Sequence, residues 1–291
     1  MTALVDGINR WRLVIWTGAV GFLLIAALSG LLGVPDSVRT LLAGGSYAVL
    51  ALAAVTVVVS VAATHSEEDL PPQPVFPPVQ GRWWAVNSPS SRVPSHGTRL
   101  YGQTFAIDLV YDPKDATPRP SGGMVAANRF PSFGQPVLAM ADGEVVTVSD
   151  WRRDHRSRTS WWALAYFFTV EGIARSIGGP SWVVGNHVVV RDVQGSFALV
   201  AHLRRGSARV RVGDRVCAGQ VIGECGNSGN STEPHVHMQL MDRRSLWIAQ
   251  GRPFSFAGAS PVAVEAHEER GGATAEGRFE GVPANGEHLD V

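Results

Sequence analysis

Two long runs without a charged residue constrain this chain more than any other feature. The first run covers Leu13–Val34, 22 residues, and the second covers Leu41–Ala63, 23 residues. Each can cross about 30 Å of hydrocarbon as a helix, and the first exceeds the apolar region of about 7–15 residues in a signal peptide. Because the connector Pro35–Thr40 is short, we expect an antiparallel two-helix transmembrane hairpin within residues 1–64. The alternative is a buried hairpin in a soluble core.

Composition agrees with a chain that is only partly in water. Lys plus Arg and Asp plus Glu each number 25, and only 17% of residues are charged, against about 25% in ordinary soluble domains. A net charge of zero provides no basic field that would attract nucleic acid. We therefore expect a lipid bilayer, and no nucleic acid, among the partners.

Flanking arginines bear on which side of the membrane the rest of the chain lies. Arg10 and Arg12 precede the first run, whereas the connector carries Arg39. The positive-inside rule then favours a cytoplasmic location for everything after Thr64, by a margin of one charge.

The remainder divides into a spacer, a domain and a tail. Residues 65–80 contain five prolines and predict a stiff linker. Residues 81–261 contain short β-branched runs separated by turn residues, which predicts a mainly antiparallel β domain. Within it, the insertion at about 151–182 holds the aromatic segment Trp161–Ile177, which either packs on the β core or forms an exposed lid or membrane-touching element. The tail, 262–291, lacks periodicity, and we expect it to be disordered.

Histidines and one aspartate carry the candidate chemistry. His235 and His237 are two residues apart in the predicted strand HVHMQLM, so both imidazoles lie on one face of the sheet. His202 ends another strand. Asp108 lies in the apolar run TFAIDLV, with Thr104 and Ala106 on its own strand face, and a carboxylate there is costly unless it is paired or bound to a metal. One aspartate and three histidines match the needs of a hydrolytic zinc site.

The stretches PVLAMADGEVVTVSD, GNHVVVRD, AHL and VGDRVCAGQVIGECGNSGNSTEPHVHMQL resemble the lysostaphin-type zinc metallopeptidases, which cleave peptide cross-links of peptidoglycan. The resemblance covers about residues 82–257. It implies a hybrid-motif β peptidase domain with a groove, and one zinc ion as the cofactor. It further implies that Asp108 and His237 are metal ligands and that His235 and His202 are catalytic.

The chain departs from the family pattern at the first ligand. The family has a histidine four residues before the metal-binding aspartate, and that position is Thr104 here. His96, in the loop PSHGTRLYGQ, is the candidate for the missing ligand, since catalytic zinc sites usually have three protein ligands. Otherwise the site is degenerate.

Two functions therefore remain. One is a membrane-anchored zinc endopeptidase whose domain lies outside the cytoplasm, as a peptidoglycan substrate requires. The other is a non-catalytic scaffold that binds wall peptides or regulates a partner hydrolase in the envelope. Cys217 and Cys225 fit either one disulfide or two thiols.

Overall fold

The computed structural model describes residues 2–62, 69–114, 119–257, 261–262 and 279–291. The chain forms two compact units, residues 1–66 and 67–291. The linker prediction for residues 65–68 and the tail prediction for residues 263–278 lie outside the described residues.

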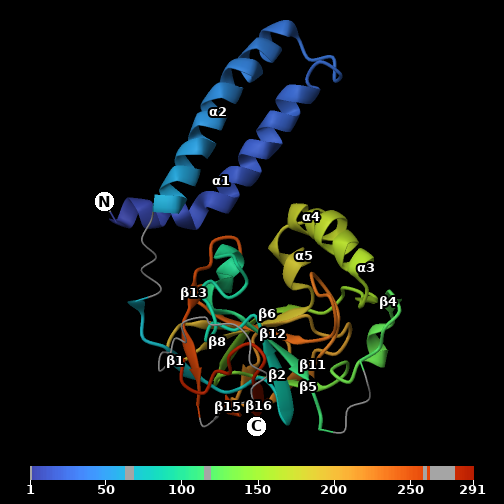
Figure 1. Cartoon of the computed structure of the whole chain (residues 1–291). Coiled ribbons are helices and arrows are strands. Elements are labelled where there is room, and N and C mark those ends of the chain that lie inside the picture. Colours follow the sequence, from blue (N-terminus) through green and yellow to red (C-terminus); the bar gives the residue numbers. More distant parts are fainter. Residues whose placement is uncertain (1, 63–68, 115–118, 258–260, 263–278) are drawn as a thin grey trace. The chain divides into compact units, whose positions relative to one another are not determined.

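The first unit is a pair of long helices, α1 (Thr2–Leu28) and α2 (Asp36–Ala62), joined by a short turn (Figure 1). Each helix contains a segment long and apolar enough to cross a membrane, Arg10–Leu28 in α1 and Asp36–Val59 in α2. Only 6% of each segment is buried within the structure. Low burial of these segments within the structure favours the membrane hairpin over a buried soluble hairpin. The helices contact each other where the Trp16 indole donates a hydrogen bond to Thr56 Oγ1, at 2.8 Å.

The second unit is built on a ten-stranded antiparallel sheet with the strand order β10-β6-β8-β9-β12-β3-β2-β16-β15, and β13 also pairs with β12. Its strands are β2 (Arg82–Val86), β3 (Ile107–Tyr111), β6 (Gly143–Ser149), β8 (His187–Asp192), β9 (Phe197–Ala201), β10 (Arg215–Val216), β12 (Val236–Met241), β13 (Gly251–Arg252), β15 (Pro261–Val262) and β16 (His288–Asp290). The predicted mainly β fold behind a two-helix hairpin is thus confirmed.

Three two-stranded sheets complete the strands. Their pairings are β1 (Gln73–Val75) with β14 (Phe254–Phe256), β5 (Pro136–Leu138) with β11 (Val221–Glu224), and β4 (Met124–Val125) with β7 (Ser157–Arg158). The insertion adds α3 (Trp161–Tyr166), a π-helical turn at Phe167–Glu171, α4 (Gly172–Ile177) and α5 (Pro180–Val184). Figure 1 shows these helical segments gathered at one end of the domain.

The core explains why β12 is central. Every residue of this strand is buried, and alternate side chains Val236, Met238 and Leu240 enter the main hydrophobic core. Because successive side chains of a strand alternate between the two faces of a sheet, His237 and Gln239 lie on the face of β12 opposite this core.

Two expected boundaries differ from the structure. Residues 73–80 are not a free spacer, since Val75 and Val79 are buried in the core and β1 pairs in parallel with β14. The tail is not disordered throughout, because β16 lies in the main sheet beside β2. Both segments are short of apolar periodicity, and pairing with distant strands supplies the order that their local sequence does not predict.

The two cysteines are free thiols in the structure, Cys217 exposed and Cys225 buried. Of the two alternatives, the structure therefore favours unpaired thiols.

Candidate metal centre

The centre forms where β12 and β3 lie side by side. In the antiparallel ladder His237 is directly opposite Asp108, and residues paired in this way project to the same face of a sheet. Accordingly His237 Nδ1 lies 2.8 Å from Asp108 Oδ1. Both side chains are buried.

His96 approaches from the loop that precedes β3. Its Nε2 lies 3.0 Å from Asp108 Oδ2, and its ring centroid lies 4.9 Å from that of His237. The loop is held by a hydrogen bond from the Ser95 amide to the Thr104 carbonyl, at 3.0 Å. Candidate ligand atoms of His96, Asp108 and His237 all lie within 4.8 Å of one another. The structure thus brings together the three residues that the sequence proposed as ligands.

Thr104 does not lie where the strand prediction put it. It belongs to the 3₁₀ segment η2 (Leu100–Phe105), and strand β3 begins only at Ile107. The expectation that Thr104 shares a strand face with Asp108 is therefore wrong. Its buried hydroxyl has no hydrogen-bond partner, and its Cβ faces the backbone of Gly251.

His235 and His202 complete the cluster. His235 Nε2 lies 3.4 Å from Asp108 Oδ1. The ring centroid of His202 lies 4.8 Å from that of His235 and 5.6 Å from that of His237. All five candidate residues named from the sequence therefore lie in one cluster.

Proton positions in the imidazoles follow from their fixed partners. Gln239 donates its side-chain amide to the Tyr101 carbonyl at 2.7 Å, which turns its Oε1 toward His237 Nε2 at 3.0 Å. Because an amide oxygen only accepts, His237 Nε2 carries the proton. Neutral His237 then directs a lone pair from Nδ1 at Asp108.

The same reasoning applies to the other rings. Carbonyl oxygens lie 2.8 Å from Nδ1 of both His235 and His202, so each Nδ1 carries a proton and each Nε2 faces the cluster. Ser95 Oγ donates to the Gln103 carbonyl and so accepts from His96 Nδ1, at 3.1 Å. The Nε2 atom of His96 is thereby turned toward Asp108.

Electrostatics make this arrangement a cation site. Burial tends to raise the pKa of Asp108, but the neighbouring imidazoles of His96, His235 and His237 hold it well below its usual range. Burial, together with the charges of His235 and His237, holds the pKa of His202 well below its ordinary value. Burial likewise lowers the pKa of His237. Burial tends to lower the pKa of His235, but Asp108 raises it above its ordinary value. An ionised carboxylate among imidazole nitrogens suits a metal ion.

Backbone strain concentrates at the same place. Three non-glycine residues in the described part of the chain have positive φ: Asn87 at 51°, Tyr101 at 60° and His202 at 60°. Asn87 donates to Asp108 Oδ2 at 2.8 Å, Tyr101 accepts from Gln239, and His202 is itself in the cluster. Left-handed conformations of such residues are costly and are retained mainly at functional sites.

Several supporting residues were missed by the sequence reasoning. Gln239 could have been found, since it continues the period of two from His235 and His237. Asn87 and Ser231, which lies 3.1 Å from His235 Nδ1, come from distant segments that carry no such signal.

The loop that orients His202 is fastened from the insertion side. Asp154 accepts from the Asn227 amide at 2.7 Å, and His155 Nε2 lies 2.8 Å from the Gly229 carbonyl. Between them lies Ser228, whose carbonyl accepts from His202.

Comparisons with known proteins bear on the fold and the family. Residues 169–250 match the model of peptidase family M23, and this segment contains His202, His235 and His237. The chain is 32% identical over 120 residues to the glycyl-glycine endopeptidase ALE-1 of Staphylococcus capitis, covering 41% of this chain and 25% of that protein. It is 42% identical over 59 residues to endolysin 2638A of Staphylococcus phage 2638A, covering 19% and 12%.

Among solved structures, the catalytic domain of lysostaphin from Staphylococcus simulans matches with a TM-score of 0.31 and 19% identity, over 64% of this chain and 91% of that one. The chain spans a quarter or less of the length of the two relatives named above. The resemblance to lysostaphin-type peptidases is confirmed by the family match.

Proposed function

We propose that this chain, whose residues 169–250 match peptidase family M23, is a membrane-anchored zinc endopeptidase that cleaves peptide cross-links of peptidoglycan. The observation that carries the proposal is the convergence of His96, Asp108 and His237, whose candidate ligand atoms all lie within 4.8 Å of one another. Asp108 and His237 are buried, and a buried carboxylate is costly unless it is paired or bound to a metal.

His96 Nε2, Asp108 and His237 Nδ1 would hold the zinc ion. The donor set of two imidazoles and one carboxylate is one that catalytic zinc uses, with a coordination position open to water. When bound, zinc would supply Lewis acidity toward the scissile carbonyl and lower the pKa of a water molecule. Gln239 orients His237 by accepting a hydrogen bond from its Nε2–H group, as supporting residues around zinc ligands commonly do.

His235 and His202 would move protons. Each has its Nδ1 proton held by a carbonyl, so each offers Nε2 to the reacting groups. One accepts a proton from water as its oxygen attacks the carbonyl carbon. The other, when protonated, stabilises the developing oxyanion. The carbon–nitrogen bond then breaks, and the amine leaves with a proton returned by the histidine that took it.

The membrane part of the proposal rests on α1 and α2, which are long and apolar enough to span a bilayer. Most of their large apolar side chains are exposed within the structure. A peptidoglycan substrate requires the domain to lie outside the cytoplasm. The arginines that flank the helices favour the cytoplasmic side, but only by one charge. A topology reporter fused after Thr64 tests this, and a cytoplasmic readout contradicts a wall substrate.

The scaffold alternative depended on Thr104 as a sign of a lost ligand. His96 beside Asp108 supplies a third candidate ligand, which is why we favour the enzyme.

The decisive experiment titrates zinc into metal-free full-length protein in detergent and assays cleavage of purified peptidoglycan. We expect one tightly bound zinc ion, lost together with cleavage in His237→Ala. The matched control is His288→Ala, which removes a buried histidine of β16 that pairs with Asp112 outside the cluster. No binding at micromolar zinc, or full cleavage by His237→Ala, contradicts the proposal.

A further inference from the structure

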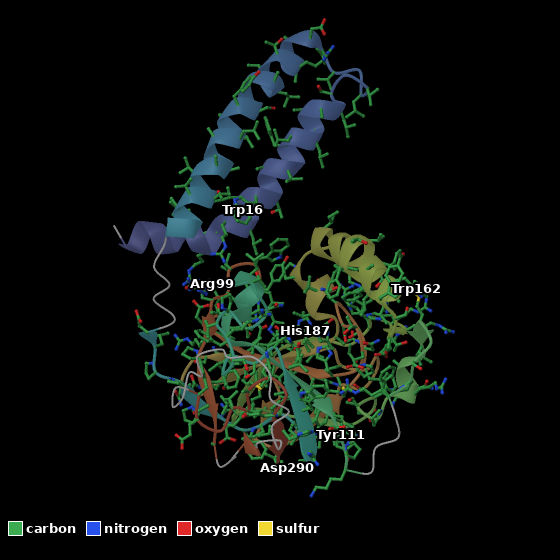
Figure 2. The ribbon with its side chains drawn as sticks, viewed as in Figure 1. Trp16, Arg99, Tyr111, Trp162, His187 and Asp290 are labelled. Atoms are coloured by element: carbon green, nitrogen blue, oxygen red, sulfur yellow. The ribbon has the colours of Figure 1, made fainter. Side chains whose placement is uncertain are left out.

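The helical insertion presents an apolar surface to its surroundings. Within α3, the π-helical turn, α4 and α5, large apolar side chains are exposed, with Ile177 82% and Trp161 81% exposed. We call this the aromatic face; its members are Trp161, Trp162, Tyr166, Phe168, Val170, Ile177 and Trp182. Figure 2 shows Trp162 at the outer edge of the helical segments. Large apolar side chains exposed together on one short segment are typical of contact sites.

The charged groups of the same segment point the other way. Glu171 forms ion pairs with Arg158 and, at 3.0 Å, with Arg175, and these three side chains are largely shielded from solvent. Burial tends to raise the pKa of Glu171, but both arginines hold it below its ordinary value. Charge faces the protein and aromatic rings face outward, the reverse of the usual order for a helix on a soluble domain.

The aromatic face is held firmly to the domain. The Asn230 amide donates to the Val183 carbonyl of α5 at 2.7 Å. Gly185 and Gly229 approach so closely that a Cβ on either would lie within 2.7 Å of the other segment's backbone. Arg158 of β7 forms an ion pair with Glu171 of the π-helical turn, which ties the helical segments to β7. A surface anchored in this way keeps its orientation relative to the sheet.

Positive charge lies at the edge of the aromatic face. The Arg152 guanidinium sits 4.4 Å from the Trp151 ring centroid and 4.3 Å from that of Trp182, and Arg153 and Arg156 are exposed nearby in sequence. Tryptophan beside arginine suits the headgroup region of a bilayer, where amphipathic rings and cations meet lipid phosphates.

Chain length limits how far the domain can move from a membrane. Between the end of α2 at Ala62 and the start of β1 at Gln73 there are ten residues, 63–72. Ten residues extend to at most about 35 Å. If α1 and α2 span the bilayer, the domain therefore remains within reach of its surface.

We propose that the aromatic face inserts into the interfacial layer of the membrane that α1 and α2 anchor, and so fixes the orientation of the β domain. This rests on the membrane anchoring proposed above, and it adds a second, peripheral contact with lipid. Val170 and Ile177 favour lipid over a glycan, because sugars stack on flat rings and need hydrogen-bonding groups beside them. The face would lie about 5–10 Å into the boundary between headgroups and acyl chains.

The test uses full-length protein in nanodiscs of phosphatidylcholine and phosphatidylglycerol, with an environment-sensitive fluorophore on single cysteines. Cys217 is replaced by serine, and Cys225 stays unlabelled because it is buried, which raises the pKa of its thiol. The label is placed by Ile177→Cys. The matched control is Val193→Cys, since Val193 is an aliphatic residue with 86% exposure in the turn between β8 and β9. Leu24→Cys reports on α1.

We expect lipids with a spin label near the headgroup to quench the Ile177→Cys fluorophore about threefold more than the Val193→Cys fluorophore, as insertion to interfacial depth requires. Leu24→Cys should be quenched best by deep spin labels. Quenching at Leu24 without quenching at Ile177 overturns this inference and leaves the anchoring intact.

Absence of quenching at Leu24 contradicts the anchoring itself. Shielding of Ile177→Cys from iodide without lipid quenching would show that protein, such as a second copy, covers the face, and would also overturn the inference.

Discussion

Polar side chains usually face water and apolar side chains are usually buried. The candidate metal centre and the helical insertion depart from this rule in opposite ways. At the centre, the partly buried His96 lies beside four buried polar side chains, those of Asp108, His202, His235 and His237. On the insertion, aromatic and aliphatic side chains are exposed while Glu171 and its arginines are shielded. We propose that a cation completes the first region and that the membrane interface covers the second.

The largest effect should come from a histidine that is not a ligand. His202→Ala is expected to lower kcat for peptidoglycan cleavage about 10²- to 10⁴-fold, the usual contribution of a general acid or base, while zinc stoichiometry stays the same. Parallel metal titration and cleavage assays check this. Loss of zinc in the variant would move His202 into the ligand set and redraw the centre.

A smaller loss is expected from the residue that orients a ligand. Gln239→Leu removes the acceptor of the His237 Nε2 proton, and we expect zinc affinity to fall about 10- to 100-fold. Calorimetric titration measures the change. Gln194→Leu, an exposed glutamine in the β8–β9 turn, is the control; equal affinities in both variants would refute the orienting role.

Thr104→His tests whether position 104 can act as a ligand site at all. Thr104 is fully buried and its Cβ lies close to Gly251, so a larger ring should overpack the site and lower the free energy of unfolding by about 1–3 kcal/mol. Thermal unfolding followed by circular dichroism gives the shift. Unchanged stability with tighter zinc binding would restore position 104 as the expected ligand position.

The smallest effect is expected on the aromatic face. Because Trp161 is largely exposed, Trp161→Ser should change the free energy of unfolding by no more than about 0.5 kcal/mol. Thermal unfolding of the detergent-solubilised chain measures it, with Thr104→His as the destabilised reference. A loss comparable to that of Thr104→His would mean that the tryptophan packs against the domain, and the contrast between the two regions would disappear.

Local patterns predicted much of the candidate site. The spacing of His235 and His237 placed both on one strand face, and the AHL segment placed His202 at the end of another strand, where it directly follows β9 in the structure. These inferences hold because the side-chain period of a strand is two, whatever lies around it.

The failures share one physical reason. Thr104 reads as a strand residue, yet η2 with a positive φ at Tyr101 and Gly102 turns the chain before β3 begins. Residues 73–80 and β16 read as spacer and tail, yet they pair with β14 and β2. In each case a contact with a distant segment overrides the local preference.

The amino-acid sequence by itself determined the long apolar helices, the alternating strands and the identity of the histidines and aspartate, since hydrophobic length and period act over neighbouring residues. Only the tertiary structure decided that His96 lies beside Asp108, that carbonyls and Gln239 set the protonated nitrogen of each imidazole, and that the aromatic rings of the insertion face outward. Those features depend on which distant segments meet, and long-range packing rather than local periodicity selects them.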